Sequence, residues 1–574
     1  MGWHGFGVFD KAVSSWFNNV FEEHGLTEDG KTVAPLFTDF CSKIASSPAT
    51  LTPTNYRPTP DQCRRSFEFD ATPPDVLHPY GYCTAMQSRT MASLPWWIMN
   101  PNPFNRRNFL ETAAGGFGSL ALADLLGRSS LLADEPRPEF NGGLHHRAKV
   151  RRVIQLFMNG GASQMDLFDY KPALFQKGGE KFDPGNGERV EAATSAPGSV
   201  LKPPFEFHQH GECGRWVTDL MPHLAKQVDR IAFCMAMQSK TNVHGPGSYL
   251  MNTGNLLPGF PCFGAWVSYG LGSLTDNLPT FVVLPDARGL PYNQKGNFSS
   301  GFLSASHQGM ILNTTSTEPI ANLKAPESAK FITNEADREG RALLQKFNAE
   351  HLKANEGDSR LEARIRAYEL AAKMQLSAPE AFNIGSETEA TQKAYGLDEK
   401  STEDFGKRCL LARRLIERGV RFVQVWSGAG GPSNNWDNHS SIVNELPPMC
   451  LATDKPIAAL LSDLNQRGLL EDTLVLWNTE FGRMPFSQGS DGRDHNGGTF
   501  VGWLAGAGIK GGASYGESDP WSWRAARDIT TTYDFHATVL HLLGIDHERL
   551  AVRHNGANRR LTDVHGHVIR KVLA

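Results

Sequence analysis

The sequence predicts an α/β fold in which helices cover both faces of a mainly parallel central sheet. Short apolar runs typical of buried strands occur at 153–157, 231–235, 280–284, 421–426 and 473–478. Segments with helical periodicity stand between these runs, for example at 404–418. Strands that alternate with helices form βαβ units, and the strands of such units lie parallel.

The first half of this pattern begins with the strand at 153–157, after which residues 215–226 are predicted to form a helix. The strand at 231–235 leads into a helix that begins near Gly247, and prolines bound the strand at 280–284. Residues 286–330 are polar and rich in Gly, Ser and Asn, which is typical of long loops that shape the mouth of an active site.

The second half begins with a charged, helix-periodic segment over 335–378, followed by a predicted loop at 386–400. A helical insertion over about 335–400 is therefore expected. Further helices are predicted at 404–418, near 448–467 and at 534–543, and each ends at a glycine, the usual residue just after a helix. A last strand is predicted at 499–504.

Composition excludes several classes of protein. The 574 residues carry a formal net charge of −4, so nothing indicates a nucleic-acid partner or an anionic membrane surface. No apolar run is long enough for an ordinary membrane span. None of the eight cysteines forms a CxxC pair, which argues against a cysteine-based zinc or redox site.

The segment Arg106-Arg107-Asn108-Phe109-Leu110, followed by an apolar stretch to Leu126, resembles a twin-arginine export signal. Such signals lie at a true N-terminus, so Met99 is the expected start. The predicted organisation is an N-terminal extension of unknown role, a signal segment, a linker and the main domain, at 1–98, 99–132, 133–150 and 151–574. A periplasmic or secreted location follows.

Carboxylate and imidazole side chains follow three of the predicted strands. Asp166 comes after the first strand, Asp437 and His439 after the strand at 421–426, and residues 478–495 after the strand at 473–478. The carboxyl ends of parallel strands share one edge of a sheet, where ligands bind. Carboxylate with imidazole is the ligand set of zinc, manganese or iron. The sequence therefore predicts a metal site at this edge.

Residues 478–495 are predicted to form one glycine-punctuated loop that contains Glu480, Asp494 and His495. Arg483 and Arg493 in the same loop suit a bidentate clamp on a phosphate or sulfate oxygen. Salt bridges to Glu480 or Asp494 that only order the loop are an equally good interpretation.

Two further features extend the hypothesis. The backbone N–H groups of Asn159, Gly160 and Gly161 are predicted to form an anion-binding nest, although a tight turn explains the two glycines equally well. His244, in the loop before a helix, is a candidate site residue, and a hydrogen-bonded loop histidine is the alternative.

Several ordered motifs resemble those of the family catalogued as domain of unknown function 1501, which is placed among alkaline-phosphatase-like and sulfatase-like proteins. They are VIQLFMNGGASQMDLFDYKP, NVHGPGSYLMNTG, LPTFVVLP, NWDNH, LVLWNTEFGRMP, GRDHNGG and DFHATVLHLLGI, and they cover roughly residues 150–555. The resemblance implies an alkaline-phosphatase-like three-layer α/β/α sandwich and a divalent metal such as zinc, manganese or calcium.

The resemblance also implies roles for single residues. Asp166 or Asp169 matches the first metal-binding Asp of the superfamily, and the other positions expected to bind metal are Asp437, His439, Glu480, Asp494 and His495. Phe481 stands where the superfamily has the His of an Asp-His pair.

The nucleophile position departs from the sulfatase pattern, because His244 takes the place of the Cys and Ser248 that of the Arg. Formylglycine cannot form here. The nucleophile is then His244, Ser248 or a water activated by the metal with His244 as acid or base, and the activated water is preferred.

The sequence thus favours an exported metal-dependent hydrolase of phosphate or sulfate esters, with a small-molecule or polysaccharide substrate. The alternative is a non-catalytic member of the same fold that binds a glycan or another partner.

Overall fold

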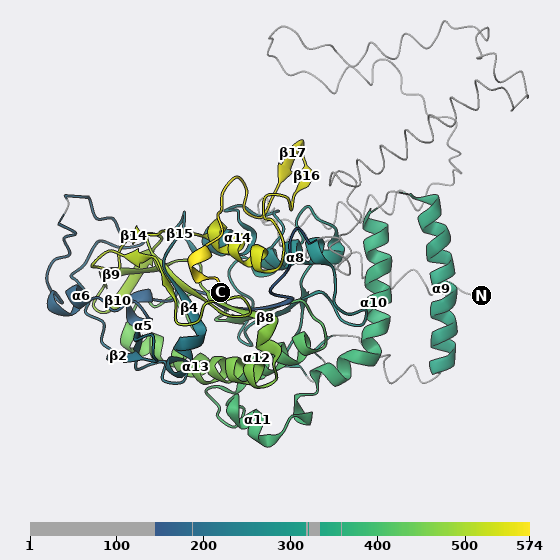
Figure 1. The fold of residues 1–574 in the computed structure, drawn as a ribbon, viewed down its shortest axis with the longest axis horizontal. Helices are drawn as coiled ribbons and strands as arrows, with labels where there is room; N and C mark the ends of the chain where they lie inside the picture. The colour runs from purple at the N-terminus through teal and green to yellow at the C-terminus, as the bar shows by residue number, and fades with distance from the viewer. Residues whose placement is uncertain (1–143, 186, 317–318, 321–332, 357–358) are drawn as a thin grey trace, which may run out of the picture. The chain divides into compact units, whose positions relative to one another are not determined.

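The computed structural model describes residues 144–185, 187–316, 319–320, 333–356 and 359–574. The extension and the twin-arginine segment lie outside these residues. The main sheet runs in the order β12-β4-β11-β8-β1-β7-β5-β6, and β15 pairs with β4 (Figure 1). Its strands are β1 (Arg152–Met158), β4 (Ile231–Gln238), β5 (Phe281–Leu284), β6 (Met310–Ile311), β7 (Phe422–Ser427), β8 (Thr473–Asn478), β11 (Phe500–Gly506), β12 (Ser514–Tyr515) and β15 (Thr530–Thr531).

The sheet is mainly parallel, as predicted. The central strand β1 pairs in parallel with β7 and with β8, and β5 continues the parallel order beyond β7. The strand β11 is the exception, because it runs antiparallel to both β8 and β4. Because β11 is antiparallel to both of its neighbours, β4 and β8 run in the same direction. The carboxyl ends of β4, β8, β1, β7 and β5 therefore lie at one edge of the sheet.

Helices cover both faces of this sheet. One apolar core joins Ile154 and Leu156 of β1 to α12 (Glu403–Glu417) and α13 (Ile442–Gln466). A second core joins Val153 and Phe157 of the same strand to α7 (His244–Thr253), α8 (Phe263–Leu271) and α14 (Thr532–Leu542). Successive side chains of a strand point to opposite faces, so a run of apolar residues fills both cores. The predicted three-layer α/β/α sandwich is confirmed (Figure 1).

The helical insertion consists of α9 (Asn334–Ala354) and α10 (Ser359–Phe382), which pack against each other. The remaining α-helices among the described residues are short: α5 (Gln164–Leu167), α6 (Pro172–Gln176) and α11 (Glu389–Ala394). Residues 386–400 are not one loop as predicted, because they include α11. The Thr388 hydroxyl accepts the Thr391 N–H at the start of this helix. Among the described residues, no helix combines the length and apolar character that a membrane span requires.

Two other predictions were wrong. Residues 215–226 do not form a helix: β3 (Arg215–Thr218) pairs with β2 (Phe207–His210), and a 3₁₀ helix follows at Leu224–Arg230. The β-branched Val217 and Thr218 favour a strand, and Pro222 interrupts the helical pattern. Residues 478–495 are not one loop, because β9 (Gly482–Gln488) and β10 (Gly492–Asn496) form a hairpin. Smaller hairpins are β13 (Glu517–Ser518) with β14 (Ala525–Arg527) and β16 (Val552–His554) with β17 (Ala557–Arg559).

Candidate metal centre

Three histidines and one aspartate, from separate parts of the chain, meet at the carboxyl edge of the sheet. His244 begins α7 after β4, Asp437 and His439 lie in the loop after β7, and His495 lies on β10. One ligand atom from each of the four residues lies within 4.8 Å of every other. We call these four residues the metal cluster.

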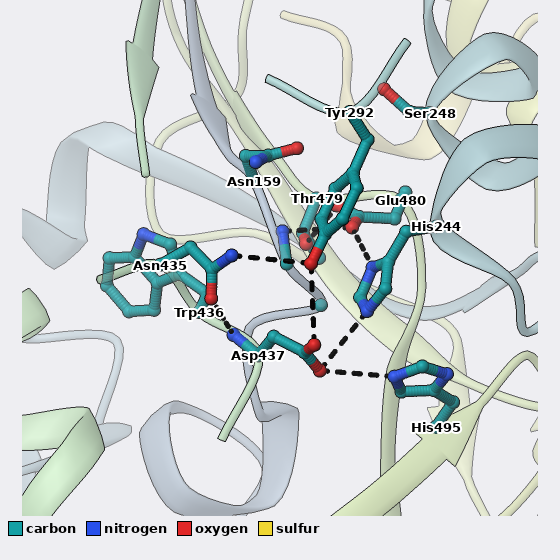
Figure 2. Close-up of polar contacts among 12 residues, drawn as sticks. Asn159, His244, Ser248, Tyr292, Asn435, Trp436, Asp437, Thr479, Glu480 and His495 are labelled. Carbon is teal, nitrogen blue, oxygen red and sulfur yellow. Dashed lines mark hydrogen bonds and ion pairs between the residues drawn. The ribbon is translucent and has the colours of Figure 1, made fainter. Parts of the chain in front are cut away.

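The carboxylate oxygen Oδ1 of Asp437 is the centre of the metal cluster (Figure 2). The Nε2 atoms of His439, His244 and His495 lie 2.8, 3.1 and 3.1 Å from it. The Nη2 atom of Arg483 donates to the same oxygen at 2.7 Å. One acidic atom therefore faces three imidazoles and one guanidinium.

The second ring nitrogen of each imidazole, Nδ1, faces an oxygen atom that can accept a hydrogen bond. Nδ1 of His244 lies 2.6 Å from Glu480 Oε1, and Nδ1 of His495 lies 2.8 Å from the carbonyl oxygen of Asn242. Nδ1 of His439 faces the amide oxygen of Gln488. A neutral imidazole has one N–H, and with a cation bound among the Nε2 atoms each ring would carry it on Nδ1 and donate it to these acceptors. The Nε2 lone pairs then point into the metal cluster.

These inward lone pairs fit a bound cation. Nε2 of His439 lies 2.7 Å from Nε2 of His495, and neither can donate to the other while both carry the proton on Nδ1. Nε2 of His244 is buried, and its 3.1 Å contact with Asp437 Oδ1 is an ion-pair contact without hydrogen-bond geometry. Histidine binds transition metals as a neutral imidazole, and the ring nitrogen that does not bind the metal usually donates its N–H to an acceptor in the protein.

Glu480 lies beside the metal cluster and contacts it through His244. Its Oε1 also accepts the N–H of Gly160 at 2.9 Å, and its Oε2 accepts the Thr479 hydroxyl at 3.1 Å. The side chain is 1% exposed. The structure thus places the predicted ligand Glu480 where it fixes the orientation of His244.

Arg483 is fully buried and contacts the metal cluster through Asp437. Besides Asp437, it donates to the carbonyl oxygens of Gly160, Gly161, Trp436 and Arg493. All of its hydrogen-bonding groups face the protein, so the structure gives it a fixed positive charge next to Asp437 and leaves no free edge for a clamp.

The two glycines before Ala162 allow this close packing. Both have positive φ, +115° at Gly160 and +72° at Gly161. A Cβ atom on Gly160 would lie 2.7 Å from the backbone nitrogen of Asp437. Since the Gly160 N–H is donated to Glu480 and the Asn159 N–H to the carbonyl oxygen of Ser427, two of the three donors of the predicted nest are already engaged.

The other predicted metal ligands lie outside the metal cluster. Asp166 forms a bidentate pair with one guanidinium edge of Arg493, with Nε–Oδ2 and Nη2–Oδ1 distances of 2.6 and 3.0 Å, and both side chains are buried. Asp494 accepts from Thr194 and Ser195.

The remaining predicted positions are also engaged elsewhere. Asp169 accepts from Ser518 and Ser522 and pairs with Lys171 at 3.2 Å. Ser248 donates to Asn297 at 3.0 Å, and it lies apart from Asp437 in Figure 2.

Asn159 donates its amide to the carbonyl oxygens of Gly428 and Ala429, so it ties the end of β1 to the loop after β7. Its Oδ1 is buried and makes no hydrogen bond.

Charge and burial shift the pKa values of the metal cluster in opposite directions. Burial alone would raise the pKa of Asp437, but Arg483 and the three imidazoles hold it far below its usual range. Burial opposes the charged form of His244, yet the Asp437 and Glu480 carboxylates raise its pKa. Burial, together with the charges of Arg483 and His244, lowers the pKa of His495 to about 4.

Sequence reasoning missed three residues around the metal cluster. Tyr292 stacks on His244 with ring centroids 4.4 Å apart, and its hydroxyl lies 3.4 Å from Asp437 Oδ2. Gln488 and Asn242 are the outer acceptors described above. Tyr292 lies in the polar segment predicted to shape an active-site mouth, but no local signal distinguishes it within that segment. An acceptor that is a backbone carbonyl, as in Asn242, leaves no signal at all.

Comparison with known proteins identifies a family whose model matches this chain. The family model described as "Protein of unknown function (DUF1501)" matches residues 150–573. No curated protein matches the chain with significant sequence similarity.

Solved structures similar to this chain are distant. The lipoteichoic acid synthase LtaP from Listeria monocytogenes aligns over 71% of this chain and 77% of its own, with 9% identity and a TM-score of 0.32. The alkaline phosphatase from the Antarctic bacterium TAB5 aligns over 69% and 99%, with 10% identity and a TM-score of 0.30. The PsFucS1 sulfatase from Pseudoalteromonas sp. aligns over 72% and 74%, with 13% identity and a TM-score of 0.29.

Proposed function

Since the chain belongs to the DUF1501 family, whose description assigns no activity, we propose a function from the geometry of its site. The protein is a metal-dependent hydrolase of phosphate or sulfate esters. The twin-arginine-like segment at 106–110 supports export to the periplasm or beyond.

The observation that carries this proposal is the convergence of three imidazole Nε2 atoms on Asp437 Oδ1, each with an acceptor at its Nδ1. His244, Asp437, His439 and His495 would hold one divalent ion. Imidazole favours zinc or iron, whereas calcium prefers an all-oxygen shell. The second positive charge at Asp437 is the Arg483 guanidinium, which supports one ion and not two.

A bound divalent cation polarises an ester oxygen and lowers the pKa of water, which makes a nucleophile available near neutral pH. The chain supplies orientation and access. Glu480 holds the ring of His244, and Tyr292 covers that ring on one face. His439 has the most exposed side chain of the metal cluster, at 25%, so the substrate would approach from its side.

A binding protein without catalysis is the second candidate, and one observation favours it. Four protein ligands fill a tetrahedral zinc site, which is the pattern of structural zinc, whereas catalytic zinc keeps a position for water. A glycan or another partner would then bind a surface that the metal only shapes. The hydrolase would turn over an ester, whereas the binding protein would not.

The test uses the full chain, loaded with zinc or iron, and the substrates 4-nitrophenyl phosphate and 4-nitrophenyl sulfate. We expect turnover of at least one ester, its loss after chelation and its return when metal is added back. The variant His439→Ala should lose turnover, while His208→Ala, an exposed histidine on β2, should keep it. Stoichiometric metal without turnover of either ester would favour the binding protein.

A further inference from the structure

A polar cavity of about 300 Å³ adjoins the metal cluster. Its walls come from residues 239–242, just before His244, and from residues 496–498, just after His495. The wall residue Asn242 is also the acceptor for His495 Nδ1, so cavity and metal cluster share part of their backbone. A volume of this size suits a small ligand or one group of a larger one.

Positive charge predominates in this cavity. Lys240, Arg189 and Arg524 line it, against one lining carboxylate, Glu191. Arg189 pairs with Glu191 at 3.3 Å, and Arg524 pairs with Glu188 at 3.1 Å. The four side chains are between 47% and 87% exposed, and ion pairs between such exposed side chains are weak.

Lys240 differs from the two arginines because its partners are neutral. Its ammonium donates to the Tyr533 hydroxyl at 3.1 Å, lies 3.4 Å from His565 Nε2 and sits 4.5 Å from the centre of the Tyr533 ring. Among the described residues, no carboxylate pairs with it. The side chain is held in place by Tyr533 while its charge is not neutralised, which prepares it to bind an anion.

Two glycines in the remaining wall pack closely against neighbouring backbone. A Cβ atom on Gly497 would lie 2.8 Å from the Thr241 carbonyl oxygen, and one on Gly498 would lie 2.6 Å from the Trp523 carbonyl oxygen. Asn496, which is 2% exposed, donates to the carbonyl oxygens of Arg483 and Trp523 and accepts the Gly498 N–H. The same segment therefore fixes both Arg483 at the metal cluster and the wall of the cavity.

We propose that this cavity, the Lys240 pocket, binds a second anionic group of the substrate. The esters hydrolysed at the metal cluster would then carry another phosphate, sulfate or carboxylate beside the reacting group. The pocket's part in choosing a substrate rests on the proposed hydrolase function, whereas its affinity for an anion can be measured without turnover.

The experiment is calorimetric titration of the zinc-loaded full chain with matched probes. One pair is a disulfated and a monosulfated disaccharide, and the other is fructose 1,6-bisphosphate and fructose 6-phosphate. We expect the member of at least one pair that carries two anionic groups to bind about tenfold more tightly, as one charge-assisted contact provides. The pair that shows the difference identifies sulfate or phosphate as the group bound.

The variant Lys240→Met should abolish this difference, and Lys226→Met, an exposed lysine on the 3₁₀ helix Leu224–Arg230, should retain it. Equal affinity for both members of each pair, or a difference that survives in Lys240→Met, would overturn the proposal.

The hydrolase proposal fails separately. If the wild type turns over no ester but prefers the probe with two anionic groups, and that preference depends on Lys240, the pocket proposal stands and the hydrolase proposal is wrong. Turnover of an ester without that preference would support the hydrolase proposal and contradict the pocket proposal.

Discussion

At the scale of single residues, the acceptor at each Nδ1 atom decides what the metal cluster can do. Glu480 is the only charged acceptor of the three, so it raises the basicity of His244 and orients it most strongly. Glu480 also holds the Gly160 N–H, which couples the end of β8 to the end of β1.

We therefore expect Glu480→Gln to weaken metal binding by about 10–100-fold, the usual effect of losing an outer carboxylate partner. The fold should persist, because the amide keeps an acceptor for the buried donors. Competition with a chelator measures the affinity. The control is Asp491→Asn, which removes a carboxylate that binds Ser441 and Ser490 outside the metal cluster. Unchanged affinity in Glu480→Gln would mean that His244 is oriented by other contacts.

Gly160 tests the close approach of the two loops. We expect Gly160→Ala to destabilise the protein by about 2–4 kcal/mol and to impair metal binding, because its Cβ would overlap the backbone of Trp436 and Asp437. Gly179→Ala is the matched control: φ is +85°, but nothing lies within 4 Å of the added atom. That change should cost only about 1 kcal/mol of backbone strain. Urea unfolding compares them, and equal losses would contradict the steric account.

At the scale of elements, the metal cluster depends on how the strand ends are joined. Asp286, after β5, accepts the Gly428 N–H after β7 at 2.7 Å and holds Arg288 at 2.7 Å. Burial opposes its charge, but Arg288 and Arg408 lower its pKa to about 2. The contact fixes the start of the loop that carries Asp437.

A depressed carboxyl pKa stabilises the fold above the unfolded value of about 3.9, and the contribution is lost as pH falls through the folded value of about 2. At neutral pH it is on the order of 2–3 kcal/mol. We expect Asp286→Asn to lower the free energy of unfolding by about this amount at pH 7 and by roughly half as much at pH 3. Urea midpoints at the two pH values measure it, and a deficit that does not shrink would exclude the ion pair as its source.

Strands were the elements that sequence predicted best. The apolar runs at 153–157, 421–426 and 473–478 correspond to β1, β7 and β8 with ends within about two residues, because strands buried on both faces need continuous apolar sequence. The hairpin β9–β10 was missed because Arg483, Arg493 and Asp494 look like solvated loop residues. Their burial depends on partners such as Asp166 that lie far away in the sequence.

At the scale of the whole molecule, the parallel order of the strands explains why the metal cluster could be predicted in part. Asp437, His439 and His495 were predicted as metal ligands and lie together in the structure, with His244 added to them. Asp166 and Asp494 lie near the same edge, but their side chains contact Arg493 and Thr194 and not the metal cluster. Order along the chain shows which strand ends meet, whereas the direction of each side chain depends on contacts that sequence does not display.

The central claim is that three imidazoles and one carboxylate hold a single divalent ion. X-ray absorption at the metal edge of the purified full chain, combined with elemental analysis, tests it most directly. The account predicts about one ion per chain and a first shell with three imidazole nitrogens, at about 2.0–2.1 Å if the ion is zinc, together with oxygen. The signal should be lost in His495→Ala. A chain that stays metal-free when zinc or iron is supplied, or a shell that lacks imidazole, would contradict the account.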